Sequence, residues 1–311
     1  MTCFHPISAI RRDDGSITFT ERGKDLHSQL TLPCGQCIGC RISRSRMWAI
    51  RCMHEASLYE NNCFLTLTYS DEHLPEGNDL HYPHYQGFMK RLRKRFQKTH
   101  KNIRFYMCGE YGDSTLRPHY HALLFNFDFE DKKVFFKTQT NNLVYRSNIL
   151  EQLWPYGQSS IGTVTEQSAG YVARYVVKKM SGRGTDINPK TNKPFNAVYD
   201  RLNAETGEIT KVQPEFTRMS LKPGIAQKWF DKFYNDVYPA DAVISEGGRK
   251  MKPPRFYDSK YELINPLQME AIKQQRILDA LKNYKEASPE RLAVKEEVLT
   301  AKTKQLKRTL Q

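Results

Sequence analysis

Alternation of apolar and polar residues in three segments predicts β-strands near the middle of the chain. In Cys63–Tyr69, the pattern places Leu65 and Leu67 on one strand face. Asn102–Tyr111 and His119–Phe127 alternate in the same way, and the loop between them is rich in turn residues. We therefore expect the second and third segments to pair as a hairpin.

Apolar residues recur at helical spacing in several other segments. Arg41–Tyr59 predicts a basic helix, and Tyr85–Phe96 predicts an amphipathic helix with a basic outer face. We also expect a short helix over Leu143–Pro155, a strand over Gln158–Val164 and a packed helix from Pro223 onward.

A third helix is predicted over Gly170–Met180. Roughly 100° per residue places Tyr171, Tyr175 and Lys178 on one face, with apolar residues on the other. Two phenols and an ammonium on one face could attack a phosphate and stabilise the developing charge. Aromatic stripes at this spacing are also typical of ordinary core helices, and that interpretation stays open from this segment alone.

The charge of the chain favours a polyanionic partner. Its 311 residues include 48 Lys and Arg against 34 Asp and Glu, a formal net charge of +14. Nucleic acid is the first candidate and an anionic membrane surface the second. No apolar run approaches the roughly 20 residues of a membrane span, and the N-terminus lacks a signal-peptide pattern. We therefore expect a soluble, cytoplasmic protein.

Six of the seven cysteines lie in the first 63 residues, and three follow a C-x₂-C-x₂-C spacing. This spacing lets thiolates converge on one ion and favours a structural zinc site over a secreted disulfide framework. An iron–sulfur cluster also uses the spacing, but its usual fourth cysteine would fall at Arg44. Cys52, His54 and His5 are alternatives for the distant fourth ligand. The predicted zinc ligands are Cys3, Cys34, Cys37 and Cys40.

A second candidate metal site lies in the predicted hairpin. His119 and His121 share one strand face, and a loop centred on Ser114–Thr115 would put Glu110 directly across from His119. Two imidazoles and a carboxylate suit Mg²⁺ or Mn²⁺. A His-x-His pair on a strand is also common at ordinary surfaces, so the facing carboxylate carries this hypothesis.

The basic residues of the amphipathic helix can be a solvated face or can contact phosphates. In so basic a chain we expect phosphate contact. The predicted DNA-binding residues are Lys90, Arg91, Arg93, Lys94 and Lys179.

Taken in order, the strand at Cys63–Tyr69, His119-Tyr-His121 and Tyr171…Tyr175-Val-Val-Lys178 resemble the three motifs of HUH endonucleases. The chain is particularly similar to rolling-circle replication initiators of microviruses, and above all to their gokushovirus branch. The resemblance covers about residues 1–260 and includes the cysteine cluster and Pro253-Pro254. One departure is Ala226, where a glycine is expected, and it bears on local packing.

The resemblance implies a metal-dependent nicking endonuclease and ligase of the tyrosine HUH type. Such an enzyme nicks the origin of a circular single-stranded DNA phage genome through a 5′-phosphotyrosine link. It releases a 3′-OH primer and later rejoins the displaced strand. Tyr175 and Tyr171 would be the nucleophiles with Lys178 beside them, and His119, His121 and Glu110 would hold Mg²⁺ or Mn²⁺.

The implied partners are single-stranded and origin duplex DNA, together with a host helicase and DNA polymerase, in the host bacterial cytoplasm and without a membrane. Two alternatives remain open. One is another HUH enzyme, such as a plasmid initiator, relaxase or transposase. The other is a non-catalytic protein that binds single-stranded nucleic acid by stacking.

The expected fold is α+β: a central antiparallel, RRM-like sheet of an HUH nuclease with helices on one face, opposite the metal site. An N-terminal zinc knuckle and C-terminal helices would flank it. The predicted divisions are a Cys-rich zinc-binding segment at 1–54, the endonuclease core at 55–182, a mobile loop at 183–215 and a C-terminal helical region at 216–311.

Overall fold

The structure is a computed structural model of the chain. It describes residues 3–12, 14, 16–19, 29–112, 115–139, 141–178, 187–188, 193–194, 199–202, 206–245, 247–282 and 284–305. Among these residues, no helix combines the length and the apolar character that crossing a membrane requires.

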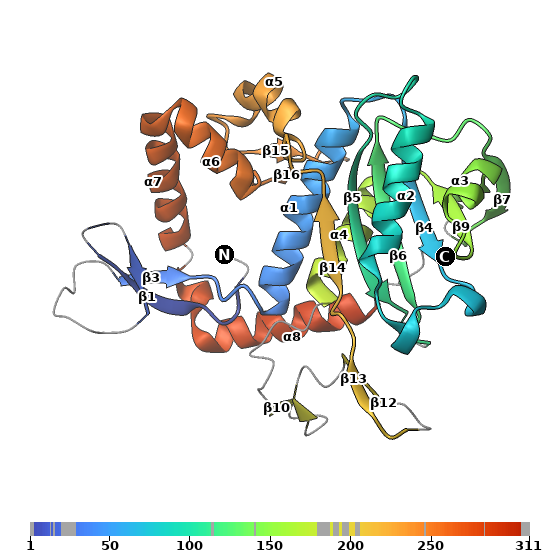
Figure 1. Ribbon diagram of the computed structural model, residues 1–311. Coiled ribbons are helices and arrows are strands. Elements are labelled where there is room, and N and C mark those ends of the chain that lie inside the picture. Colours follow the sequence, from blue (N-terminus) through green and yellow to red (C-terminus); the bar gives the residue numbers. More distant parts are fainter. Residues whose placement is uncertain are drawn as a thin grey trace.

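A seven-stranded antiparallel sheet occupies the centre of the molecule (Figure 1). Its strand order is β14-β5-β6-β4-β9-β8-β7, so the strands predicted from alternation lie side by side in the middle. The strands are β4 (Asn62–Thr68), β5 (Arg104–Tyr111), β6 (Pro118–Phe125), β7 (Lys133–Lys137), β8 (Leu143–Arg146), β9 (Ser159–Gly162) and β14 (Phe216–Met219).

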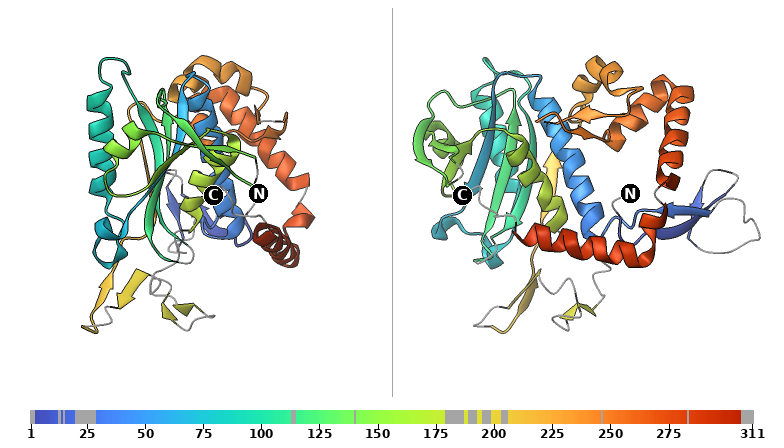
Figure 2. Two further views of the ribbon diagram at one scale, coloured as in Figure 1. Left: turned by 90° about the vertical axis from the view of Figure 1, so that its right-hand side faces the viewer. Right: turned by 180° about the vertical axis from the view of Figure 1, so that it is seen from behind.

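Helices cover both faces of this sheet, and the prediction of helices on one face alone is wrong. α2 (Tyr82–Arg95) and α3 (Asn148–Leu153) lie on one face, whereas α1 (Ile38–Ala56) and α4 (Glu166–Lys178) lie on the other (Figure 2). The physical reason is that nearly every residue of β5 and β6 is buried or half-buried. Strands buried on both sides need a cover on both sides.

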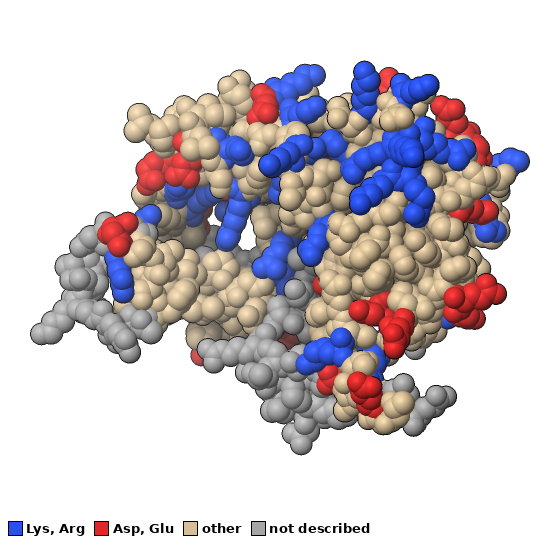
Figure 3. Space-filling model, viewed as in Figure 1, with Lys and Arg blue, Asp and Glu red and all other residues tan. Residues whose placement is uncertain are grey.

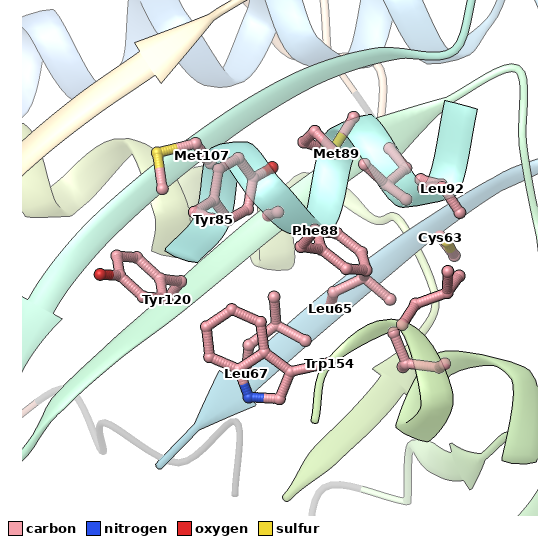
Figure 4. Packing of buried hydrophobic residues seen from close by; sticks show 14 of the residues in the cluster. Cys63, Leu65, Leu67, Tyr85, Phe88, Met89, Leu92, Met107, Tyr120 and Trp154 are labelled. Carbon is pink, nitrogen blue, oxygen red and sulfur yellow. The ribbon is translucent and has the colours of Figure 1, made fainter. Parts of the chain in front are cut away.

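The α2 face holds a tightly packed apolar core (Figure 4). Alternation directs Leu65 and Leu67 of β4 to this face, as predicted, and both are fully buried. Trp154, also fully buried, donates its indole N–H to the Thr68 carbonyl at 2.8 Å. Each such side chain contributes roughly 1.5–3 kcal/mol to folding. The side chains of α2 in this core are Tyr85, Phe88, Met89 and Leu92.

The opposite face is organised by a buried ion pair. The Glu55 carboxylate of α1 accepts a hydrogen bond from Arg104 Nε of β5 at 2.5 Å, and both residues are buried. Arg104 also donates to the Pro223 carbonyl, and Glu55 accepts from the Ala226 backbone N–H. Ala226 itself has a φ of +62°, a left-handed conformation that glycine adopts most readily. This conformation explains why the departure from glycine at this position is local.

The C-terminal segment packs on the α1 side of the sheet (Figure 2). Its helices α6 and α7 are joined by Arg276, which makes ion pairs with Asp241 and Asp258. Phe216–Met219, which lies within the predicted C-terminal helical region, forms the edge strand β14. The helices are α5 (Gln227–Val237), α6 (Arg255–Ile264), α7 (Pro266–Lys282) and α8 (Pro289–Gln305).

The segment Leu143–Arg146 forms strand β8, so the prediction of a helix from Leu143 to Pro155 is correct only for its second half, α3. Ser147 separates the two elements because its hydroxyl accepts the Leu150 N–H and caps α3.

Smaller elements surround the central sheet. The remaining strands form small sheets: β1 (Ile7–Arg11), β2 (Ile17–Thr18), β3 (Gln29–Leu32), β10 (Ile187–Asn188), β11 (Lys193–Pro194), β12 (Asp200–Leu202), β13 (Ile209–Lys211), β15 (Val243–Ile244) and β16 (Lys250–Met251). Short 3₁₀ turns lie at Asp71–His73, Glu76–Asn78 and Tyr284–Ala287.

Candidate metal centre and tyrosine helix

The hairpin of β5 and β6 has the register that the sequence predicts. Glu110 lies directly across from His119, and Cys108 lies across from His121. Because side chains alternate along a strand, all four point to the sheet face that α4 covers. Glu110 and His121 are almost fully buried there. The hairpin therefore gathers two imidazoles and a carboxylate at one place.

The three predicted ligands lie within reach of a single ion. Nε2 of His119 is 2.7 Å from Oε1 of Glu110, and Nε2 of His121 is 3.0 Å from the same oxygen. One ligand atom from each residue lies within 4.8 Å of the others, so the group could hold a metal. Three protein ligands leave coordination positions open for water or substrate.

The far nitrogens of both imidazoles have hydrogen-bond partners, as in most protein metal sites. His119 donates its Nδ1–H to the Arg117 carbonyl at 3.1 Å. This bond fixes the tautomer in which Nε2 carries a lone pair. Nδ1 of His121 lies 3.0 Å from the Thr66 hydroxyl. Thr66 stands across from His121 in the sheet, a neighbour that sequence reasoning missed because it depends on β4 pairing with β6.

The environment of Glu110 favours its ionised form. Burial alone would raise the pKa of this carboxyl, but hydrogen bonds to His119 and His121 and the charge of these imidazoles lower it below the usual value. Glu110 is therefore a carboxylate at neutral pH, the form that binds a cation.

The tyrosine helix α4 passes beside this cluster. The ring of Tyr171 meets the ring of His121 edge to face, with centroids 5.0 Å apart. Val172 and Ala173 are buried on the other side of the helix, as predicted. Tyr175 lies one turn further along α4, but its side chain and that of Lys178 lie outside what the structure describes, and Lys179 lies wholly outside the described residues.

Reciprocal hydrogen bonds fix the start of α4. The Thr165 N–H donates to the Ser168 hydroxyl at 2.8 Å, and the Ser168 N–H donates to the Thr165 hydroxyl at 3.1 Å. This arrangement is a capping box, which satisfies donors that have no partner within the helix. A fixed helix start holds Tyr171, three residues further on, in a defined position next to His121.

Four cysteines converge at the start of α1. The sulfurs of Cys3, Cys34, Cys37 and Cys40 lie within 4.8 Å of one another and could hold a metal. Backbone N–H groups point at these sulfurs: Cys34 N–H lies 3.2 Å from the Cys3 sulfur, and Phe4 N–H lies 3.3 Å from the Cys37 sulfur. Such donors stabilise thiolates.

The electrostatics of the cysteine cluster are uneven. Burial would raise the pKa of Cys37, but donation from the Phe4 and Cys40 backbones and neighbouring thiols lowers it to about 7. Burial raises the pKa of Cys3. Cys37 is also the N-cap residue of α1, where the helix dipole favours a negative charge. The cluster thus contains at least one thiol that ionises near neutral pH, as a metal ligand must.

The alternative fourth ligands serve other contacts. Cys52 is fully buried in the core, His54 lies 2.8 Å from the Tyr257 hydroxyl, and His5 pairs with Glu296 of α8 at 2.7 Å. Among the residues that the structure describes, Cys3 is the ligand that completes the cluster with the C-x₂-C-x₂-C motif.

The predicted DNA-binding residues on α2 are not brought to either cluster, because α2 lies on the far face of the sheet. Arg91 and Arg93 donate to the backbone carbonyls of Leu153 and Ile103. Lys90 and Lys94 are exposed to solvent. Figure 3 shows Lys and Arg gathered along the upper part of this face.

The chain is similar to known phage proteins. A family model for replication-associated proteins of the ORF2 type matches residues 62–180. The replication-associated protein VP4 of Bdellovibrio phage phiMH2K is 32% identical over 273 residues, 86% of this chain and 79% of that protein. The replication-associated protein ORF2 of Spiroplasma virus 4 is 31% identical over 259 residues, 80% of this chain and 73% of that protein. No solved structure gives a significant match.

Proposed function

Because the chain belongs to the family of phage replication-associated proteins, we propose that it initiates rolling-circle replication as an HUH endonuclease. In this proposal it nicks the origin of a circular single-stranded DNA genome in the host cytoplasm. The observation that carries the proposal is the edge-to-face contact between Tyr171 and His121, which joins a nucleophile candidate to a three-ligand cluster.

The Glu110, His119 and His121 cluster fits a divalent ion such as Mg²⁺ or Mn²⁺. Its donors are two imidazoles and an ionised carboxylate, and the outer nitrogen of His119 is already held by a carbonyl. When bound there, such an ion would polarise a phosphodiester and neutralise charge that develops on its oxygens.

The chemical step is an exchange of one phosphodiester for another. A tyrosine hydroxyl oxygen forms a bond to phosphorus, the bond from phosphorus to the 3′-oxygen breaks, and the proton of the phenol is transferred so that a free 3′-OH results. A phenol is a weak nucleophile near its pKa of about 10, so the site must stabilise the developing phenolate. We assign the nucleophiles to Tyr175 and Tyr171 of α4, with Lys178 as a further source of positive charge.

Two tyrosines on one helix allow a full replication cycle. One tyrosine holds the 5′-phosphate of the cut strand while a host polymerase extends the 3′-OH. The other tyrosine cuts the regenerated origin, and the newly freed 3′-OH attacks the first phosphotyrosine link. This attack closes the displaced strand and releases the first tyrosine. The sequence contains no P-loop pattern, so a host helicase would supply the unwinding.

We propose a structural zinc ion for the Cys3, Cys34, Cys37 and Cys40 cluster. Four sulfur donors at a helix start match the ligand type and number of closed zinc sites. A closed site has no open position for substrate. Its role would be to fix the N-terminal segment to α1.

The decisive experiment is a covalent-adduct assay. The purified protein is mixed with Mn²⁺ and single-stranded DNA that carries the phage origin, and adducts are detected after denaturation. The native chain should form an adduct, and the double variant Tyr171→Phe/Tyr175→Phe should form none. Tyr82→Phe on the opposite sheet face is the matched control and should retain it. An adduct in the double variant would overturn the assignment of nucleophiles, and no adduct in the native chain would favour a non-catalytic binding protein.

A further inference from the structure

A groove continues from the candidate metal centre across the same sheet face, over the part that α1 and α4 leave open. It has a volume of about 290 Å³ and is lined by strands β4, β9, β8 and β7 and by the start of α4. Phe64 and Thr66 of β4 line the groove and also contact His121, the first by ring stacking at 5.6 Å and the second through its hydroxyl. The groove and the metal centre are therefore continuous.

The two ends of the groove differ in chemistry. Near the metal centre its walls are rich in hydroxyl groups, which can donate and accept hydrogen bonds. At the far end Phe135 and Phe136 of β7 are 58% and 42% exposed. The guanidinium of Arg146 lies 5.1 Å from the centre of the Phe135 ring. The hydroxyl-bearing residues that line the groove are Thr66, Thr68, Ser159, Ser160, Thr163 and Ser168.

A bulge in β7 accounts for two consecutive phenylalanines in one groove. Val134 pairs with Tyr145 and Phe136 pairs with Val144, so two steps along β7 match one step along β8. Phe135 is the extra residue. In a regular strand neighbouring side chains point to opposite faces, whereas a bulge redirects one of them. The rings of Phe135 and Phe136 lie 5.3 Å apart and both line the groove.

Exposed phenylalanines on an edge strand are a hazard for solubility unless a ligand uses them. Here they lie at the end of a groove that leads to a candidate phosphodiester site, in a chain with a net charge of +14. Unpaired nucleobases stack on aromatic rings, whereas the bases of a duplex are already stacked on one another. Hydroxyl groups can then bond to base edges or phosphates.

We propose that this groove binds the unpaired strand next to the scissile phosphate, with nucleobases stacked on Phe135 and Phe136. Arg146 adds positive charge at the same end and contacts a backbone phosphate. The inference rests on the proposed nicking function for its orientation relative to the metal centre. It assigns a substrate subsite to β7 and β8, which the nucleophile and metal ligands do not touch.

The test measures binding without cleavage. Fluorescence anisotropy is recorded with labelled oligothymidylate of about 16 nucleotides in the presence of EDTA. Phe135→Ala and Phe136→Ala should each raise the Kd at least about 5-fold, the loss expected for one stacked base. Phe136→Trp should restore binding, and Phe136→Leu, which keeps an apolar side chain, should not. Phe19→Ala removes an equally exposed phenylalanine of the N-terminal segment and should leave Kd unchanged.

Two further measurements separate the outcomes. Binding of a blunt duplex of the same length should not change in Phe135→Ala or Phe136→Ala, because its bases cannot stack on these rings. If both alanine variants bind oligothymidylate like the native chain while still forming covalent adducts, the groove proposal is wrong and the nicking function stands. If they lose binding while the native chain forms no adduct, the groove proposal stands and the nicking function is wrong.

Discussion

The ring of Tyr171 stands at 89° to the ring of His121, so the helix and the hairpin meet edge to face at the candidate metal centre. The two residues are far apart in the chain and come from different elements, α4 and β6. Their contact places one hydroxyl-bearing ring of α4 against a ligand candidate, and it can be tested without reference to activity.

Paramagnetic broadening should report this contact. In protein with isotope-labelled tyrosine rings, Mn²⁺ should broaden the NMR signal of Tyr171, because a paramagnetic ion on His121 would lie next to that ring. The signal of Tyr82 on the opposite sheet face should broaden much less. In His119→Ala the selective effect should disappear, and equal broadening of both tyrosines would argue against a metal on these ligands.

Thr66→Val should weaken metal binding although Thr66 is not a ligand candidate. The substitution removes the hydroxyl that lies 3.0 Å from Nδ1 of His121 and leaves that nitrogen without this partner. Loss of an outer hydrogen bond of this kind typically costs about 10–100-fold in metal affinity. Isothermal titration with Mn²⁺ measures the change.

The matched control is Thr68→Val. Thr68 lies two residues along the same strand, and its hydroxyl donates to the Gln158 carbonyl rather than to a ligand candidate. Its affinity for Mn²⁺ should stay near that of the native chain. Equal losses in the two variants would mean that the hydroxyl of Thr66 acts only through the stability of β4.

Cys37→Ser should abolish zinc binding. The native chain should contain about one equivalent of zinc, measured by elemental analysis, because the four sulfurs form a single cluster. The variant should lose the metal and melt at a lower temperature, since binding to such a site contributes to folding. Cys52→Ser changes a buried cysteine outside the cluster and should keep the zinc. Iron in the native protein, with absorption in the visible range, would contradict the zinc assignment.

His54 should make the fold sensitive to acid. It stacks on Trp229 at 3.5 Å, and burial lowers its pKa to about 4, below the usual 6.5. The unfolded chain therefore binds this proton more tightly than the folded chain does. The contribution to stability is complete above about pH 6.5 and is lost as pH falls toward 4.

Urea unfolding at pH 7 and at about pH 5 measures this loss, which should be on the order of 2 kcal/mol for His54. The His54→Gln variant should be less stable at pH 7 but lose less stability on acidification. His5→Gln, at an exposed site, should show the acid loss of the native chain. If His54→Gln and the native chain lose the same amount, another group carries the acid sensitivity.

The sequence predicts the parts of the site that local spacing controls. The loop between β5 and β6 sets their register, so Glu110 opposite His119 follows from counting residues. Helical spacing likewise predicts that Val172 and Ala173 are buried. The domain divisions remain predictions.

Other features depend on which distant elements become neighbours. Thr66 contacts His121 only because β4 pairs with β6. The groove exists because β9 and β8 extend the sheet beyond β4, and Leu143–Arg146 is a strand because β7 and β9 flank it. The second helical layer does not follow from alternation, because Tyr106 and Cys108 lie on the face of β5 opposite the predicted core, yet both are fully buried.

The buried ion pair between Glu55 and Arg104 limits how this chain can be divided. Its two charges come from α1 and β5, and its remaining hydrogen bonds come from Pro223 and Ala226. A fragment limited to the family segment 62–180 would keep Arg104 but lose all three of these partners. A buried charge without its partner costs about 3–5 kcal/mol. Recombination between phage genomes that separates these segments would therefore be selected against unless both sides of the pair are inherited together.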